Sequence, residues 1–226
     1  QAAAALANLA RESEENRNAI VRADGIPPIL ALLDSQSGKA KENAVSAITE
    51  LCSNSKSQAA NQTAIANEDG IAKLVNVLLS FSNMTMKDPA LLHLCSLAAA
   101  AIKQMAKGNQ ENQEAVAEAG ATASLVAMLG APVAQMQANA AGALANLARN
   151  HRANQLAIAK TGAISPLCTL LREGSAEAKD RSASAIWSLA TDNSHNKDTI
   201  AKLGGIDPLL GLLISGTSAK SQECVA

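Results

Sequence analysis

The chain has 226 residues and a net charge of −1, and its hydrophobic 48% is mostly Ala and Leu, with only 1% aromatic residues. This composition argues against a β-barrel or β-sandwich, which would use Val, Thr and aromatic residues in short alternating runs. The near-neutral charge argues against nucleic acid or acidic lipid as a partner. No uninterrupted apolar run reaches the roughly 18 residues that a membrane-spanning helix needs.

A polar residue recurs at the centre of an apolar phrase along the whole chain. The phrase reads "ALANLA" near both residue 8 and residue 146, and "AIWSLA" near residue 188. We call the central polar positions the ladder positions: Asn8, Glu50, Gln104, Asn146 and Ser188. They lie 42, 54, 42 and 42 residues apart, so the basic period is 42 residues. Repetition at this period predicts a solenoid in which each repeat covers the apolar side of the next.

Each period is predicted to contain three helices. The first is short, as in residues 154–160, and ends at Gly or Asp followed by Gly or Ala, a helix-stop signal. The second begins at Pro28, Pro166 or Pro208 in three repeats, because proline is tolerated in the first helical turn. The third is longer, as in residues 177–190. Each first helix contains an Asn four residues before Ile or Val; these are Asn16, Asn61, Asn112, Asn154 and Asn196.

Two insertions explain the departures from the 42-residue period. The first-helix Asn positions lie 45, 51, 42 and 42 residues apart. The extra residues fall in "CSNSKSQAAN", between Glu50 and Asn61, and around "SFSNMTMKDP", between Ile71 and Gln104. Both stretches are rich in Ser and Asn, so both are predicted to be loops.

We therefore expect residues 1–226 to form a single array that is a fragment of a longer solenoid. The expected divisions are a partial third helix at 1–11, repeats at 12–53, 54–107 (with the insertions), 108–149 and 150–191, and a partial repeat at 192–226. Solenoids usually carry polar capping repeats. Since the two ends of this chain lack such caps, we expect end-to-end self-association.

The phrases "N-x-x-x-I", "G-[AI]-I-x-P-L" and "A-L-x-N-L-A" resemble armadillo repeats over the whole chain. The resemblance implies an all-α fold, a right-handed α-solenoid (superhelix) of three-helix armadillo repeats. It also implies a concave groove along the third helices, in which ladder Asn side chains bind the backbone of an extended partner peptide. Importin-like members have Trp four residues before each ladder position, where this chain has Ala4, Ser46, Ala100, Gly142 and Ser184. Nuclear-import cargo is therefore not the expected partner.

Residues at helical spacing from the ladder positions should share one polar face. Trp187, the single tryptophan, lies one residue before the ladder position Ser188 and is added to this face. The predicted partner contacts are Asn139, Asn146, Arg181, Trp187, Gln104, Asn43, Glu50, Ser188 and Asn8. The alternatives are that Trp187 fills the core between repeats and that Arg181 pairs with Glu177 on its own helix. For Asn146, Glu50 and Ser188 the alternative is a solvated or interhelical hydrogen-bonding role.

The sequence offers little for catalysis or for a cofactor. The four cysteines include no C-x-x-C pair, so they are expected to be reduced and buried. His151 and His195 are expected in loops after third helices, with no Cys or carboxylate at ligand spacing. No Ser–His–Asp or Cys–His set is indicated, so we expect no enzyme activity, no cofactor and no metal.

The expected function is a protein-interaction scaffold that holds a protein or an extended peptide in its groove. One alternative is an assembly module of a larger complex, for example axonemal or cytoskeletal, that uses its ends or convex face. Another is the substrate-recognition segment of a ubiquitin ligase. An intracellular, cytoplasmic location is expected, with the nucleus as the alternative.

Overall fold

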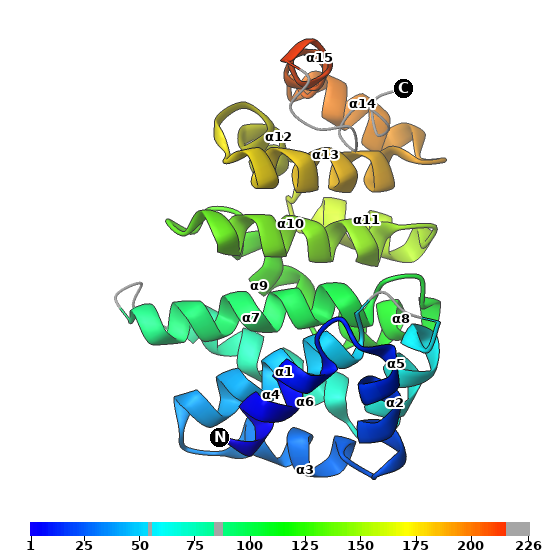
Figure 1. Cartoon of the computed structure of the whole chain (residues 1–226). Coiled ribbons are helices and arrows are strands. Elements are labelled where there is room, and N and C mark those ends of the chain that lie inside the picture. Colours follow the sequence, from blue (N-terminus) through cyan, green and yellow to red (C-terminus); the bar gives the residue numbers. More distant parts are fainter. Residues whose placement is uncertain (54–55, 84–87, 216–226) are drawn as a thin grey trace. The chain divides into compact units, whose positions relative to one another are not determined.

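The computed structural model describes residues 1–53, 56–83 and 88–215 (Figure 1). These residues form fifteen α-helices and two short 3-10 helices, with no strand among them. The helices are α1 (Ala2–Ala10), α2 (Glu14–Arg22), α3 (Ile26–Ala31), η1 (Leu32–Asp34), α4 (Gly38–Leu51), α5 (Gln58–Asn67), α6 (Gly70–Leu79), η2 (Ser80–Asn83), α7 (Pro89–Met105), α8 (Gln110–Glu118), α9 (Ala121–Met128), α10 (Ala134–Ala148), α11 (Arg152–Lys160), α12 (Ile164–Glu173), α13 (Ala176–Ala190), α14 (Ser194–Lys202) and α15 (Ile206–Ser215).

The chain divides into two compact units, Gln1–Ala121 and Thr122–Ala226. We call them the N-terminal and the C-terminal unit. In the N-terminal unit, α4 contacts both α1 and α7, so three predicted third helices are neighbours. In the C-terminal unit, α10 contacts α13, and the two helices lie side by side in Figure 1. The predicted third helices therefore pack against one another within each unit.

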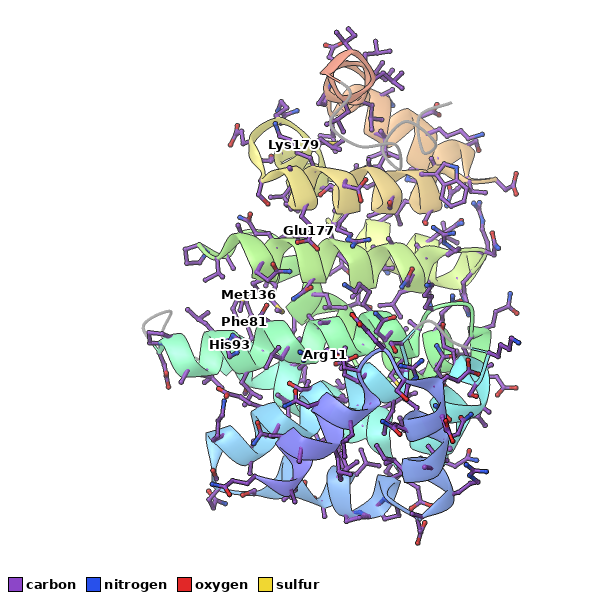
Figure 2. The ribbon with its side chains drawn as sticks, in the orientation of Figure 1. Arg11, Phe81, His93, Met136, Glu177 and Lys179 are labelled. Carbon is purple, nitrogen blue, oxygen red and sulfur yellow. The ribbon has the colours of Figure 1, made fainter. Side chains whose placement is uncertain are left out.

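Small side chains allow this close helix packing. Ala138, Ala141 and Ala145 of α10 are buried, and so are Ala183 and Ala185 of α13. Alanine also has the highest helix propensity, so the same residues favour both the helix and its contacts. Larger apolar side chains such as Met136 fill the remaining core (Figure 2).

Local signals fix where the helices begin. The side chains of Ser37 and Ser175 accept hydrogen bonds from the N–H groups of Ala40 and Ala178, which caps α4 and α13. Pro28, Pro166 and Pro208 lie in the first turns of α3, α12 and α15, as the sequence predicts.

The stop signal between first and second helices has a clear backbone cause. The second residue after each first helix has a positive φ, and these residues are Asp24, Asp69, Gly120, Gly162 and Gly204. The next residue lies close to the first helix. A Cβ on Gly70 would come within 2.4 Å of the Cγ2 atom of Ile65. Only a left-handed residue followed by Gly or Ala fits this turn.

The Asn of each first helix joins that helix to the end of the preceding third helix. Its side-chain amide donates to a backbone carbonyl at distances of 2.8 to 3.0 Å; the pairs are Asn16–Leu9, Asn61–Leu51, Asn112–Met105, Asn154–Leu147 and Asn196–Leu189. Four of these five Asn side chains are buried, and Asn16 is half-buried. The carbonyls at a helix C-terminus lack partners inside the helix, so the recurring Asn supplies one.

Two predicted loops are partly helical. In the first insertion, α5 already begins at Gln58, before the recurring Asn61. In the second, residues 80–83 continue α6 as the 3-10 helix η2, because the Ser80 hydroxyl donates to the Val77 carbonyl and Phe81 is buried. Residues 54–55 and 84–87 lie outside the described residues.

Candidate functional site

The predicted polar face of the C-terminal unit lies on α10 and α13. Asn146 of α10 and Arg181 of α13 are partly exposed, as a binding face requires. Asn139 and Ser188, in contrast, are buried and are not available to a partner in this structure. Asn139 accepts a hydrogen bond from the Gln135 side chain, at 3.4 Å. Asn139 and Ser188 have short side chains, and they are buried where α10 and α13 pack closely.

Ser188 is a buried ladder residue whose side chain carries the energetic cost of an unpaired polar group. Its side chain is fully buried and its hydroxyl oxygen has no hydrogen-bond partner. Its backbone carbonyl accepts a hydrogen bond from the Gln155 side chain, at 3.0 Å. Ser188 therefore joins the interior of the C-terminal unit through its backbone, and we remove it from the predicted contacts.

Arg181 lies beside Glu177 one turn earlier on α13, with 3.7 Å between Nη2 and Oε1. Figure 2 labels Glu177 near the start of this helix. Both side chains are partly exposed, and ion pairs of this kind contribute only about 0.3–0.5 kcal/mol. This weak pair leaves Arg181 able to exchange Glu177 for a carboxylate of a partner.

Trp187 lies at the surface, with 39% of its area exposed. The guanidinium carbon of Arg149, just after α10, lies 4.8 Å from the centre of the indole ring. This distance is within the range of a cation–π contact. The contact places a cation and an aromatic ring together at the C-terminal ends of α10 and α13, next to the ladder positions of both helices.

The N-terminal unit presents a more varied set of ladder residues. Asn8 is exposed, and Asn43 and Gln104 are partly exposed. Glu50 forms an ion pair with Arg11, whose Nε atom lies 3.2 Å from Oε1 of the carboxylate. Arg11 follows α1 (Figure 2), so the pair joins the ends of two neighbouring third helices. An anionic ladder residue is thereby partly neutralised.

Two kinds of reactive group matter for the described residues, a metal site and a nucleophilic thiol. No three His, Cys, Asp or Glu side chains in that part of the chain are placed to hold a metal ion. Burial raises the pKa of the Cys52 thiol to about 12, and burial also raises the pKa of Cys95 and Cys168. A protonated thiol is a poor nucleophile at neutral pH.

His151 lies between α10 and α11, as the sequence predicts, whereas the placement of His195 differs from the prediction. His151 precedes α11 and its Nδ1 atom accepts from the Asn154 N–H at 3.3 Å, so it is a helix cap. His195 lies inside α14 rather than in a loop, because Asn193 takes the capping position one residue before that helix.

Sequence reasoning missed two contributors to these faces. Arg11 and Arg149 follow third helices and interact with residues of the next one, Glu50 and Trp187. The recurring basic residue just after "ALANLA" was the available signal for both. The structural role of the first-helix Asn was also missed, although its spacing was recognised.

Comparisons with known proteins agree with this geometry. The sequence model of the Armadillo/beta-catenin-like repeat matches residues 13–53 and 109–149. The designed armadillo repeat protein YIII(Dq)4CqI is 26% identical, with a TM-score of 0.85 over 99% of this chain and 89% of that one. The designed armadillo repeat protein YIII(Dq.V1)4CPAF, solved with the peptide (KR)4, is 26% identical, with a TM-score of 0.83 over 99% of this chain and 88% of that one.

A further similar structure is of computationally designed armadillo repeat proteins for modular peptide recognition, with 26% identity and a TM-score of 0.82 over 99% of this chain and 89% of that one. A search of curated proteins gives no match. Residues 13–53 and 109–149 match the armadillo repeat, and the fold of the chain is similar to that of designed armadillo repeat proteins. The predicted all-α armadillo solenoid is confirmed. No helix in the described part of the chain has the length and apolar character to cross a membrane.

Proposed function

We propose that the chain is a non-catalytic scaffold that binds an extended segment of a partner protein along its third helices. The observation that carries the proposal is the surface around Asn146, Arg181, Arg149 and Trp187 in the C-terminal unit. These four residues come from two adjacent third helices and the residue that follows α10.

The chemistry of this surface suits a peptide. The Asn146 amide has both donor and acceptor atoms, which match the N–H and C=O groups of an extended backbone. The two arginines offer planar donors to carboxylates or carbonyls. Trp187 offers an apolar ring of the kind that often dominates binding energy. The likeness to designed armadillo proteins, one of which is solved with a peptide, supports the same use here.

The N-terminal unit extends the proposal to Asn8, Asn43, Glu50 and Gln104. Their exposure allows contact with a partner, and Glu50 adds an acidic group that Arg11 only partly neutralises. We expect this region to contribute less binding energy than the C-terminal surface, because it has no exposed aromatic side chain among its ladder-helix residues.

The test is selection of linear peptides from a random display library against the whole chain. Their affinities would then be measured for the wild type and for Asn146→Ala combined with Arg181→Ala. We expect the double variant to bind about thirtyfold more weakly, since each of the two lost polar contacts contributes about 1 kcal/mol and about 1.4 kcal/mol corresponds to a factor of ten. Arg172→Glu, an exposed change on α12, is the matched control. Equal affinity of the double variant and the wild type would remove the proposal.

A further inference from the structure

A second hollow lies away from the third helices, between the first helices α11 and α14 of the C-terminal unit. We call it the first-helix groove. Its volume is about 350 Å³, and its walls include Leu156, Lys160, His195 and Thr199. All of these residues belong to one compact unit.

The walls of the groove follow from helical spacing. Arg152, Leu156 and Lys160 are four residues apart on α11 and so share one face, as do His195 and Thr199 on α14. Leu156 is 45% exposed, although it is a large apolar side chain. It lies between two cationic residues of its own helix. The groove thus combines an uncovered apolar wall with the cationic side chain of Lys160, and Arg152, which donates to the Asp192 carbonyl, lies one turn before Leu156.

The charge of these helices distinguishes them from the corresponding helix of an earlier repeat. Helix α11 carries Arg152 and Lys160 and no acidic residue, and α14 carries Lys197 and Lys202 against Asp198. Helix α8 instead carries three glutamates and no basic residue; they are Glu111, Glu114 and Glu118.

A hollow of about 310 Å³ occurs at the corresponding place in the N-terminal unit, and its walls include Asp69 and Glu111. The recurring Asn shows that the two places correspond, because Asn196 lines one hollow and Asn112 the other. The armadillo repeat therefore produces the hollow, and local residues set the sign of its charge.

We propose that the first-helix groove binds an acidic segment of a partner protein, with one apolar side chain of that segment placed against Leu156. Carboxylates on either side of the apolar residue pair with Lys160 and with Arg152, which flank Leu156 on α11. Burial of the apolar side chain supplies affinity, and the charges supply orientation and selectivity against basic segments. This proposal does not depend on peptide binding by the third helices.

The probe is a fluorescein-labelled synthetic peptide with one leucine between runs of Glu and Asp, titrated with the whole chain and followed by fluorescence anisotropy. We expect saturable binding that weakens as salt is raised, because the charges of Lys160 and Arg152 are screened. A peptide with Lys in place of the acidic residues should not bind. A peptide with Ser in place of the leucine should bind several-fold more weakly.

Three variants locate the site. Lys160→Glu should weaken binding about tenfold, since it replaces an attraction by a repulsion, and Leu156→Ala should weaken it several-fold. Arg172→Glu, with the same charge change on an exposed part of α12, should leave the affinity within about twofold, because surface charges at a distance are screened. Leu156 and Lys160 are exposed, so circular dichroism and melting should show both variants folded.

Two results would overturn the proposal. One is the absence of saturable binding by the acidic peptide. The other is binding that Lys160→Glu leaves unchanged and that Arg149→Ala with Arg181→Ala abolishes. That second result would place the acidic peptide on the third helices, and it would support the proposed function while removing the first-helix groove.

Discussion

The recurring asparagines show how one residue type can have a purely structural role that resembles a functional motif. Each donates its side-chain amide to a carbonyl at the end of a third helix, and four of the five are buried. The ladder residues, which occur once in each of the same repeats, are more variable in type. The regular recurrence of Asn in the first helices thus marks packing, whereas the variable ladder positions include both exposed residues and the buried Ser188.

Replacing Asn154 with Ala should destabilise the protein. The change removes the donor at 3.0 Å from the Leu147 carbonyl and leaves that acceptor buried. A buried unpaired acceptor costs about 1–3 kcal/mol, so the free energy of unfolding in denaturant should fall by this amount. Asn8→Ala, at an exposed helical position, is the control and should change stability by less than about 0.5 kcal/mol. Similar losses in both variants would show that the Asn154 contact does not stabilise the fold.

The buried Cys52 thiol is expected to make the free energy of unfolding fall at alkaline pH. Burial raises the Cys52 pKa from 9.0 to about 12, so the folded state keeps a proton that the unfolded state releases. The stabilisation is complete below pH 9 and is lost as the pH rises from about 9 towards about 12. Chemical unfolding measured across this range should show a decline that is smaller in Cys52→Ala. An identical decline in the variant would contradict the assignment to Cys52.

Turns between the first and second helices are the elements that sequence alone predicts best. The Gly or Asp followed by Gly or Ala is local, and its left-handed backbone is present at all five places. The helix starts at Pro28, Pro166 and Pro208 are also local, and the structure has them.

Exposure of the ladder residues could not be predicted in the same way. Ser188 and Asn146 occupy equivalent helical positions, but only Ser188 is fully buried. Burial depends on how neighbouring helices pack, and spacing along one helix does not contain that information. The contact of Arg149 with Trp187 likewise joins two helices, so the recurrence of a basic residue after "ALANLA" marks the position of Arg149 but does not identify its partner.

Gly70→Ala should test how tightly the turn before α6 is packed. The added Cβ would lie 2.4 Å from the Ile65 Cγ2 atom and 2.6 Å from its carbonyl oxygen, so the helices must shift. We expect a loss of about 1–3 kcal/mol, typical of overpacking. In Gly38→Ala the added Cβ meets nothing within 4 Å, so stability should be unchanged or slightly higher. The stabilities of the two variants would be compared by thermal and chemical unfolding. A Gly70→Ala variant as stable as the wild type would show that the turn can accommodate the added Cβ without loss.

The 226-residue chain should self-associate, as the sequence predicts, and the structure offers α15 as the contact surface. Ile206, Leu210 and Ile214 lie at intervals of four residues on α15 and are 53%, 48% and 88% exposed. A contiguous apolar stripe of this kind favours association. Sedimentation velocity should show an average mass that rises with concentration, and Leu210→Lys with Ile214→Lys should lower it to that of a monomer. Ala153→Lys, on exposed α11, is the control. A wild-type mass independent of concentration would rule the association out.

The most direct measurement uses Trp187, the single tryptophan of the chain, as a reporter of peptide binding by the third helices. Its ring is 39% exposed and lies under Arg149, beside the ladder positions of α10 and α13. Acrylamide quenching of its fluorescence would be measured with and without a saturating, tryptophan-free peptide selected from the display library. A peptide along the third helices should cover the ring and lower the quenching constant, and Asn146→Ala with Arg181→Ala should restore it by weakening binding. A saturating peptide that leaves the quenching unchanged would contradict binding at this surface.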